Sequence, residues 1–172
     1  AFLQCPLTVD DQAFRQSVQL LDTGLIPQGG TSMATAIQTA MTAFDEETDN
    51  YKAIILMTDG EDHQEGALEA ASQAQKNGFL VYTLGLGTPE GELIQITNEK
   101  GQRSFLKDEN GNTVKSRLNE SLLRDLAREG NGSYILMRDA NTLATLYRNN
   151  LEPLPKSELS SRLIRQYIER FQ

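Results

Sequence analysis

The stretch that most constrains the fold runs over residues 51–62, where an apolar segment ends abruptly in acidic residues. Residues 53–58 read Ala-Ile-Ile-Leu-Met-Thr, without the alternation of polar and apolar side chains that marks a half-exposed strand. This pattern predicts a strand covered on both faces, as in a parallel α/β sheet. Asp59 follows it at once, and ligands of open parallel sheets bind beyond the carboxyl ends of the strands. Asp59 is therefore a candidate binding residue; the alternative is a solvated Asp-Gly turn that caps the next helix.

Two more segments predict strands of the same kind, over residues 79–84 and 133–137. A helix is predicted over 64–77, between the first two strands, and its four alanines at 67, 70, 71 and 74 would let it lie close to a sheet. Two strands joined by a helix form a βαβ unit, so these strands should be parallel with a right-handed crossover. The chain is therefore predicted to be an α/β protein.

Apolar stripes and capping residues predict further helices. Asp10 is a predicted N-cap, and Phe14, Val18 and Leu21 form a stripe that we assign to the core. Residues 1–8, ahead of this helix, are predicted as a short strand and a loop. Three more helices are expected near residues 31, 119 and 140, with stripes at Met33, Ala36, Ile37, Ala40, Met41 and Phe44, at Leu122, Leu123, Leu126 and Ala127, and at Leu143, Leu146, Tyr147 and Leu151.

Residues 93–117 break this pattern. Gly101 and the sequence Asp-Glu-Asn-Gly at 108–111 separate short mixed segments, which predicts an insertion rich in hairpins. Near the other end, Pro153 and Pro155 separate a final helical segment, over 153–172, from the domain that we assign to residues 1–152.

Composition limits the classes of function. The 172 residues suit one domain with a core of its own. A formal net charge of −8 argues against a nucleic-acid-binding protein, which needs a basic face. No apolar run approaches the roughly 20 residues that span a bilayer. Cys5 is the single cysteine, so it has no internal disulfide partner.

The second candidate for chemistry is the sequence Gly-Gly-Thr-Ser at residues 29–32. A glycine pair lets the backbone turn tightly and aims the Thr31 hydroxyl at whatever binds there. The alternative is that Thr31 or Ser32 simply caps the helix that follows. The Thr31 hydroxyl and the Asp59 carboxylate together would suit a hard divalent cation such as Mg²⁺.

Three other features carry weaker signals. Residues 85–89 read Gly-Leu-Gly-Thr-Pro, which differs from a dinucleotide-binding fingerprint because the third glycine is misplaced and a proline interrupts the expected helix; a tight turn is predicted instead. His63, the one histidine, is interpreted as a solvated residue of an acidic turn. No base can be paired with Cys5 from the sequence.

These residues, taken in order, resemble the von Willebrand factor A domain. The resemblance consists of Gly-Gly-Thr at 29–31 before an alanine-rich helix, Thr-Asp-Gly-Glu-Asp at 58–62 after a strand, and the later segments 81–87 and 132–134. The bacterial aerotolerance (Bat) proteins, above all the BatB-like branch, are most similar, through residues 2–10, 116–119 and Leu146-Tyr147. The resemblance covers about residues 1–152. It implies a Rossmann-like three-layer sandwich with a mostly parallel sheet and an insertion at about 93–117.

The family implies a metal-ion-dependent adhesion site, in which a D-x-S-x-S loop, a threonine and an aspartate converge on one divalent cation. Thr31 corresponds to that threonine and Asp59 to that aspartate. The sequence contains no D-x-S-x-S, and we expect that the chain begins after that loop. The implied Mg²⁺ (or Mn²⁺ or Ca²⁺) therefore belongs to the intact parent protein, and the chain alone is expected to bind it weakly or not at all.

The resemblance also implies a context. It predicts a protein-interaction module of a bacterial envelope complex linked to aerotolerance or stress, with protein partners that include other Bat-type proteins. The parent would be membrane-anchored, with the domain on the extracytoplasmic side. Residues 153–172 would then lead toward a membrane helix; the alternative is a terminal helix packed on the domain.

The expected absence of the family's first strands has a structural consequence. Those strands lie beside the strand at 53–58, so its hydrogen-bonding edge should be exposed. We expect the chain to self-associate through this edge, or its own residues 1–4 to pair there as a strand.

Two alternative functions match parts of the sequence. A Mg²⁺-dependent hydrolase or phosphoryl-transfer enzyme would use Asp59 as nucleophile or metal ligand, but Glu61 gives only a loose match to the second carboxylate and no basic residue is placed to hold phosphate. The other is a structural domain with a vestigial site. The interaction module, which is not an enzyme, is the prediction that the whole set of motifs favours.

Overall fold

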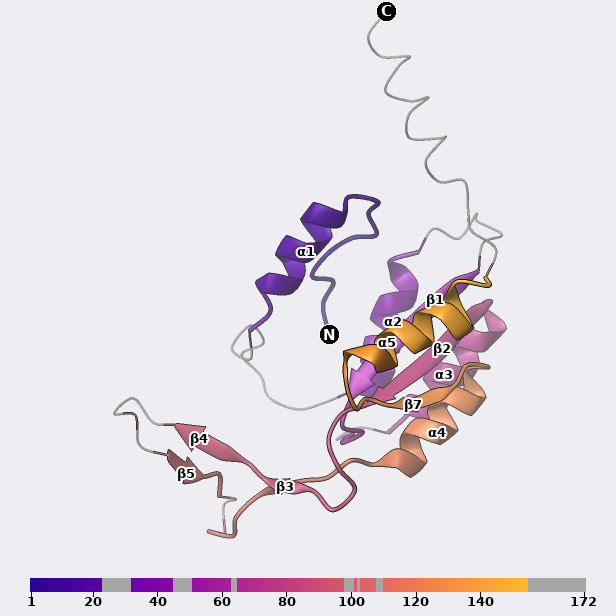
Figure 1. The fold of residues 1–172 in the computed structure, drawn as a ribbon. Coiled ribbons are helices and arrows are strands. Elements are labelled where there is room, and N and C mark those ends of the chain that lie inside the picture. Colours follow the sequence, from indigo (N-terminus) through magenta and orange to yellow (C-terminus); the bar gives the residue numbers. More distant parts are fainter. Residues whose placement is uncertain are drawn as a thin grey trace, which may run out of the picture.

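The computed structural model describes residues 1–22, 32–44, 51–62, 65–97, 101, 103–107 and 110–154. Its helices are α1 (Asp11–Gln19), α2 (Met33–Thr42), α3 (Ala67–Lys76), α4 (Glu120–Glu129), α5 (Ala140–Leu146) and a π-helical turn, η1 (Tyr147–Leu151). Its strands are β1 (Lys52–Thr58), β2 (Phe79–Gly85), β3 (Glu92–Leu93), β4 (Gln95–Thr97), β5 (Arg103–Phe105), β6 (Lys115–Ser116) and β7 (Tyr134–Leu136). Figure 1 shows their arrangement.

The central sheet has the order β1-β2-β7, and both pairs of neighbours are parallel. β1 and β2 pair along their whole length, from Lys52 opposite Phe79 to Thr58 opposite Gly85. The three strands predicted from apolar runs are thus confirmed, as is their parallel arrangement. Their carboxyl ends meet at one edge of the sheet, which is the edge where Asp59 follows β1.

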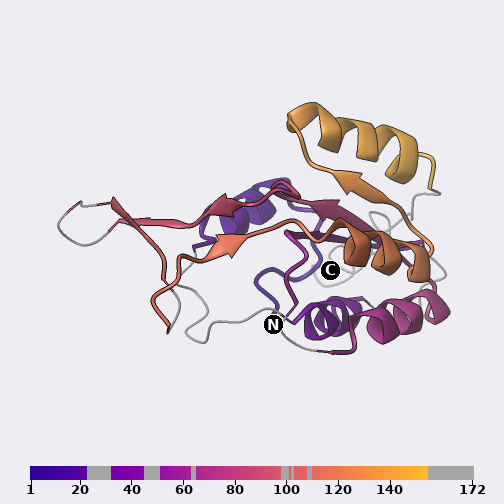
Figure 2. The ribbon, with the colours of Figure 1, turned by 90° about the horizontal axis from the view of Figure 1, so that it is seen from below.

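Helices cover the sheet in two layers, which makes the fold a three-layer sandwich (Figure 2). Helices α2, α3 and α4 lie on one face, where the alanines of α3 pack against Val81 in one cluster of buried residues. Helix α5 lies on the other face, where Leu146 packs against Tyr82 and Leu84. The predicted α/β sandwich is therefore confirmed, together with the alanine face of α3.

The prediction that the first strand is covered on both faces is wrong. Ile54 of β1 is buried, but Ile55 and Met57 are 39% and 52% exposed. Ile55 and Met57 point to the face on which α5 lies, but α5 packs on their register partners in β2, Tyr82 and Leu84, and not on these two residues. β1 is also the last strand of the sheet among the described residues, so its outer edge has no strand beside it there. The predicted exposed edge of this strand is confirmed within the part of the chain that the structure describes.

The amino-terminal segment also departs from prediction. Residues 1–8 form no strand, so residues 1–4 do not pair with β1. Helix α1 forms with Asp10 as its N-cap, as predicted, but its apolar stripe is not core: Phe14, Val18 and Leu21 are 53%, 47% and 58% exposed. Figure 1 shows α1 standing apart from the sheet. An apolar stripe becomes core only where another layer meets it, and none of the described elements does so here.

The predicted hairpin-rich insertion is confirmed as an arm, which we define as residues 91–117. Strand β3 pairs with β6 and β4 pairs with β5, and both pairs are antiparallel. The arm extends away from the sandwich in both ribbon views (Figures 1 and 2). It leaves the sandwich after β2 and returns to it at α4.

The remaining helix limits are close to prediction. Asn119 caps α4, which ends at Gly130, and α3 begins at Ala67, later than predicted, because Gly66 has a positive φ of 100°. The predicted helix at 155–172 lies outside the described residues, as do Thr31 and His63. No helix in the described ranges has the length and apolar character needed to cross a membrane.

Candidate metal and partner site at the carboxyl end of β1

The Asp59 carboxylate is held in place by protein donors on both of its oxygens. Oδ1 accepts a hydrogen bond from the Glu61 N–H at 3.2 Å and a longer one from the Thr58 hydroxyl at 3.5 Å. Oδ2 accepts one from the Ser116 hydroxyl at 2.9 Å. A hydrogen bond to a charged acceptor is stronger than one between neutral groups, so the orientation of the carboxylate is well defined.

The backbone after Asp59 turns against the start of α4. The Asn119 N–H donates to the Asp59 carbonyl at 2.8 Å. Gly60 is buried at a φ of +80°, and a Cβ there would lie 2.9 Å from the Asn119 carbonyl oxygen. Only glycine fits both the left-handed conformation and this close approach. The alternative of a plain solvated turn is thus replaced by a packed turn that joins β1 to α4.

The base of the arm is fixed to the same turn. Besides the Ser116 hydroxyl, the Arg117 N–H donates to Glu61 Oε1 at 3.4 Å. Just beyond the arm, the Leu118 N–H donates to the Thr88 carbonyl at 3.0 Å, which fixes the chain to the loop after β2. Ser116 was not among the residues chosen from the sequence, because it lies 57 residues from Asp59 and no local pattern connects them.

Thr31 lies outside the described residues, and the described part resumes at Ser32, just before α2. Ser32 is the N-cap of α2: its hydroxyl oxygen accepts from the Thr35 N–H at 3.3 Å. The Met33 N–H donates to Asp62 Oδ1 at 3.4 Å. The start of α2 therefore lies against Asp62, in the acidic sequence that follows Asp59.

The oxygen atoms around Asp59 match part of a site for a hard cation. A carboxylate flanked by the Ser116 and Thr58 hydroxyls is an oxygen donor set of the kind that Mg²⁺ takes. The set is not a complete cage: no three His, Cys, Asp or Glu side chains gather in the described part of the chain. Glu61 and Asp62 instead accept from backbone N–H groups of the arm and of α2. Asp59 thus fits one ligand position of such a site.

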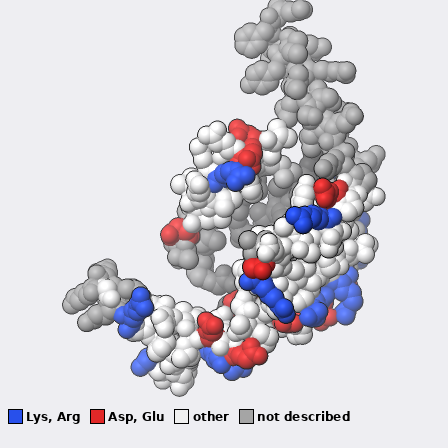
Figure 3. All heavy atoms as spheres, in the orientation of Figure 1, with Lys and Arg blue, Asp and Glu red and all other residues white. Residues whose placement is uncertain are grey.

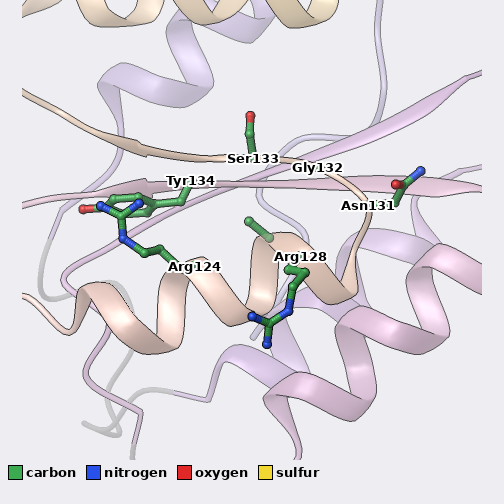
Figure 4. Close-up of a pocket in the computed structure, with 7 residues that line it drawn as sticks. Arg124, Arg128, Asn131, Gly132, Ser133 and Tyr134 are labelled. Carbon is green, nitrogen blue, oxygen red and sulfur yellow. The ribbon is translucent and has the colours of Figure 1, made fainter.

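A hollow lies between α4 and β7, away from Asp59 (Figure 4). Arg124 lies over the Tyr134 ring, 4.5 Å from its centre, and is paired with Glu120, while Arg128 is paired with Asp125. The Ser133 side chain points to the other side of β7. Burial and the charge of Glu120 raise the pKa of Tyr134. Both arginines of this hollow are thus paired with acids of the same helix, and we assign no ligand to it.

Comparison with known proteins identifies the family of this chain. The family model of the von Willebrand factor type A domain matches residues 4–120. The chain therefore belongs to the von Willebrand factor A domain family, whose members generally act as protein-interaction modules. No curated protein matches the chain.

Two solved structures narrow the class to relatives of aerotolerance-related proteins. One is an aerotolerance-related membrane protein from Bacteroides fragilis carrying multiple mutations to serine. It is 33% identical, has a TM-score of 0.81, and the match covers 89% of this chain and 74% of that one. The other is BatB from Bacteroides thetaiotaomicron, which is 32% identical with a TM-score of 0.81 over 88% of this chain and 72% of that one. The predicted family and its Bat-type branch are confirmed.

Proposed function

We propose that this domain binds a protein partner through a divalent cation that Thr31 and Asp59 help to hold, within a bacterial envelope complex linked to aerotolerance. The observation that supports this most is the placement of Asp59. It follows a parallel strand at the binding edge of the sheet, with its carboxylate oriented by Ser116 and by the Glu61 N–H. Such positioning lowers the entropic cost of capturing a ligand there.

The oxygen atoms of Asp59 and Thr31 define the proposed role of each residue in holding the cation. Asp59 supplies negative charge and its neighbours fix its direction, while the Thr31 hydroxyl is the second proposed ligand. A bound Mg²⁺ would supply an electrostatic link to an acidic side chain of the partner. The D-x-S-x-S ligands are not in this sequence, so affinity for the cation in this chain should be low. The Bacteroides fragilis relative is described as a membrane protein, which supports a membrane-anchored parent. We propose other Bat-type proteins as partners and place the domain on the extracytoplasmic side.

The site is not proposed to be catalytic. Among the described residues, no Lys or Arg side chain forms an ion pair with Asp59. An aspartyl nucleophile for phosphoryl transfer would need such a group.

The test is a Mn²⁺ titration of the chain followed by NMR. Mn²⁺ should broaden the amide signals of Gly60 and Arg117 first, because they flank Asp59. Asp59→Asn keeps the shape of the side chain but removes its charge, and should weaken binding about tenfold or more, as loss of a ligand charge does. The matched control is Glu69→Gln, an exposed acid on α3.

Partner binding is read out with the chain immobilised and an envelope extract passed over it. Proteins retained in Mn²⁺ should be released by EDTA, lost with Asp59→Asn and kept with Glu69→Gln. Equal retention by both variants would contradict the proposed site. Metal-dependent hydrolysis of p-nitrophenyl phosphate that disappears in Asp59→Asn would contradict the non-catalytic assignment.

A further inference from the structure

The arm has two different faces. In antiparallel pairs, residues opposite one another share a face, as do residues two apart along a strand. The register pairs Gln95 with Phe105 and Leu93 with Lys115, and an isolated bridge pairs Lys107 with Thr113. One face therefore carries Leu93, Arg103, Phe105, Lys107 and Lys115, which we call the basic face.

The opposite face holds the arm together. Backbone hydrogen bonds link Ile94, Leu106 and Val114 in a ring: the N–H of each donates to the carbonyl of another, at 2.8 to 3.3 Å. All three side chains are half-buried, which is consistent with packing against one another on that face. Ser116 lies on this same face by register and reaches Asp59. The arm is thus a defined element anchored at its base, and the basic face is its other side.

The basic face is exposed, and among the described residues of the arm its cations have no acidic neighbour on the same face. Leu93 and Phe105 are each 45% exposed, and the three cations are exposed as well. No acidic residue lies on this face among the described positions, and none of its cations forms an ion pair there. On the sandwich, which we call the body, Arg124 and Arg128 are by contrast paired with acids of their own helix. Figure 3 shows Lys and Arg side chains on the projecting arm.

We infer that the basic face binds an acidic, partly apolar segment of the protein partner whose carboxylate reaches the site at Asp59. This rests on the proposed function, because the arm is rooted at that site through Ser116 and Arg117. Because the basic face is on the side of the arm opposite Ser116, it would contact a different segment of that partner from the one at Asp59. Three cations, none of which forms an ion pair with a described residue, are interleaved with two half-exposed apolar side chains, and this pattern complements carboxylates that alternate with apolar groups. The chain itself has a net charge of −8, so this face differs in sign from the molecule as a whole.

The experiment uses a fluorescent random copolymer of glutamate and tyrosine as the acidic, partly apolar probe, with anisotropy as the readout. The arm variant carries Arg103→Glu, Lys107→Glu and Lys115→Glu. The control variant carries Lys76→Glu, Arg138→Glu and Arg148→Glu, three exposed cations of the body, and changes the net charge equally. In Mn²⁺ the arm variant should bind about tenfold more weakly than the wild type, and the control less than about threefold, since reversed contacts at an interface cost more than remote charges. Thermal unfolding verifies that both variants fold.

The proposed function and this inference fail in different ways. Binding that depends on the arm but is unchanged by EDTA and by Asp59→Asn supports the basic face and contradicts the metal-dependent site. Equal losses in the arm and control variants overturn the basic face, because they indicate a general charge effect. Tighter binding to phosphatidylglycerol vesicles than to the copolymer overturns the choice of a protein partner. Self-association in light scattering that disappears only in the arm variant overturns it in favour of a second copy of this chain.

Discussion

Strands β1 and β2 lie side by side, have similar apolar sequences, and have very different surroundings. Val81 and Leu84 of β2 are completely buried, whereas Ile55 and Met57 of β1 are 39% and 52% exposed. β2 lies between two strands and beneath helices on both faces, while β1 has a neighbouring strand on one side only among the described residues. An apolar run therefore specifies that a segment forms a strand, and the topology around it decides how much of that strand is buried.

The difference separates a structural strand from a strand available for binding. β2 contributes to both clusters of buried residues: Phe79 and Val81 to one, and Tyr82 and Leu84 to the other. β1 contributes Ile54 to the first cluster and places Asp59 at the binding edge. We expect substitutions in β2 to act on stability, and substitutions in the exposed part of β1 to act on association.

The sharpest test compares two residues that face each other across the two strands, since Met57 is the register partner of Leu84. Leu84→Ala should lower the free energy of unfolding by about 3 kcal/mol, because it removes buried methyl groups and leaves a cavity. Met57→Ala should lower it by less than about 1 kcal/mol, because the side chain is half exposed. Urea unfolding followed by circular dichroism measures both. Equal losses of unfolding free energy in the two variants would show that the face of β1 that carries Met57 is covered in solution.

The same contrast explains how far the sequence could predict the fold. Helices α3 and α4 were predictable because their signals are local, namely four alanines on one face and the Asn119 cap. The stripe of α1 showed amphipathicity but could not show whether a partner layer would meet Phe14. At the site, Asp59 followed from its place after β1, whereas the bond from Ser116 spans 57 residues and leaves no local pattern. Contacts between distant segments depend on the assembled fold.

A second prediction concerns a buried hydroxyl in β2. The Thr83 hydroxyl donates to the Leu123 carbonyl of α4 at 2.8 Å and is fully buried. Thr83→Val keeps the shape but removes this donor, and should cost about 1 to 2 kcal/mol. The matched control is Thr145→Val, whose exposed hydroxyl donates to the Asn141 carbonyl at 2.9 Å and should change stability by about 0.5 kcal/mol or less. A similar loss of unfolding free energy in both variants would contradict the view that the buried Thr83 hydroxyl stabilises the fold more than an exposed one.

The last prediction concerns the open edge of β1, where the expected change in stability is smallest. An edge strand with exposed apolar side chains is a template for pairing with another chain, and lysine on such a strand opposes pairing. We therefore expect the chain to self-associate, and the double variant Ile55→Lys, Met57→Lys to shift it toward the monomer in light scattering. Because both side chains are substantially exposed, its unfolding free energy should change by less than about 1 kcal/mol.

The control for this variant adds the same charge elsewhere, with Gln73→Lys on α3 and Ser121→Lys on α4, both at exposed positions. It should associate as the wild type does, since repulsion between net charges is not the cause of the effect. A wild-type chain that is monomeric at all concentrations would contradict pairing through β1. If the control also loses association, the effect of the β1 variant is caused by its added charge and not by its place on the open edge. β1 and β2 would then differ in burial but not in their tendency to associate.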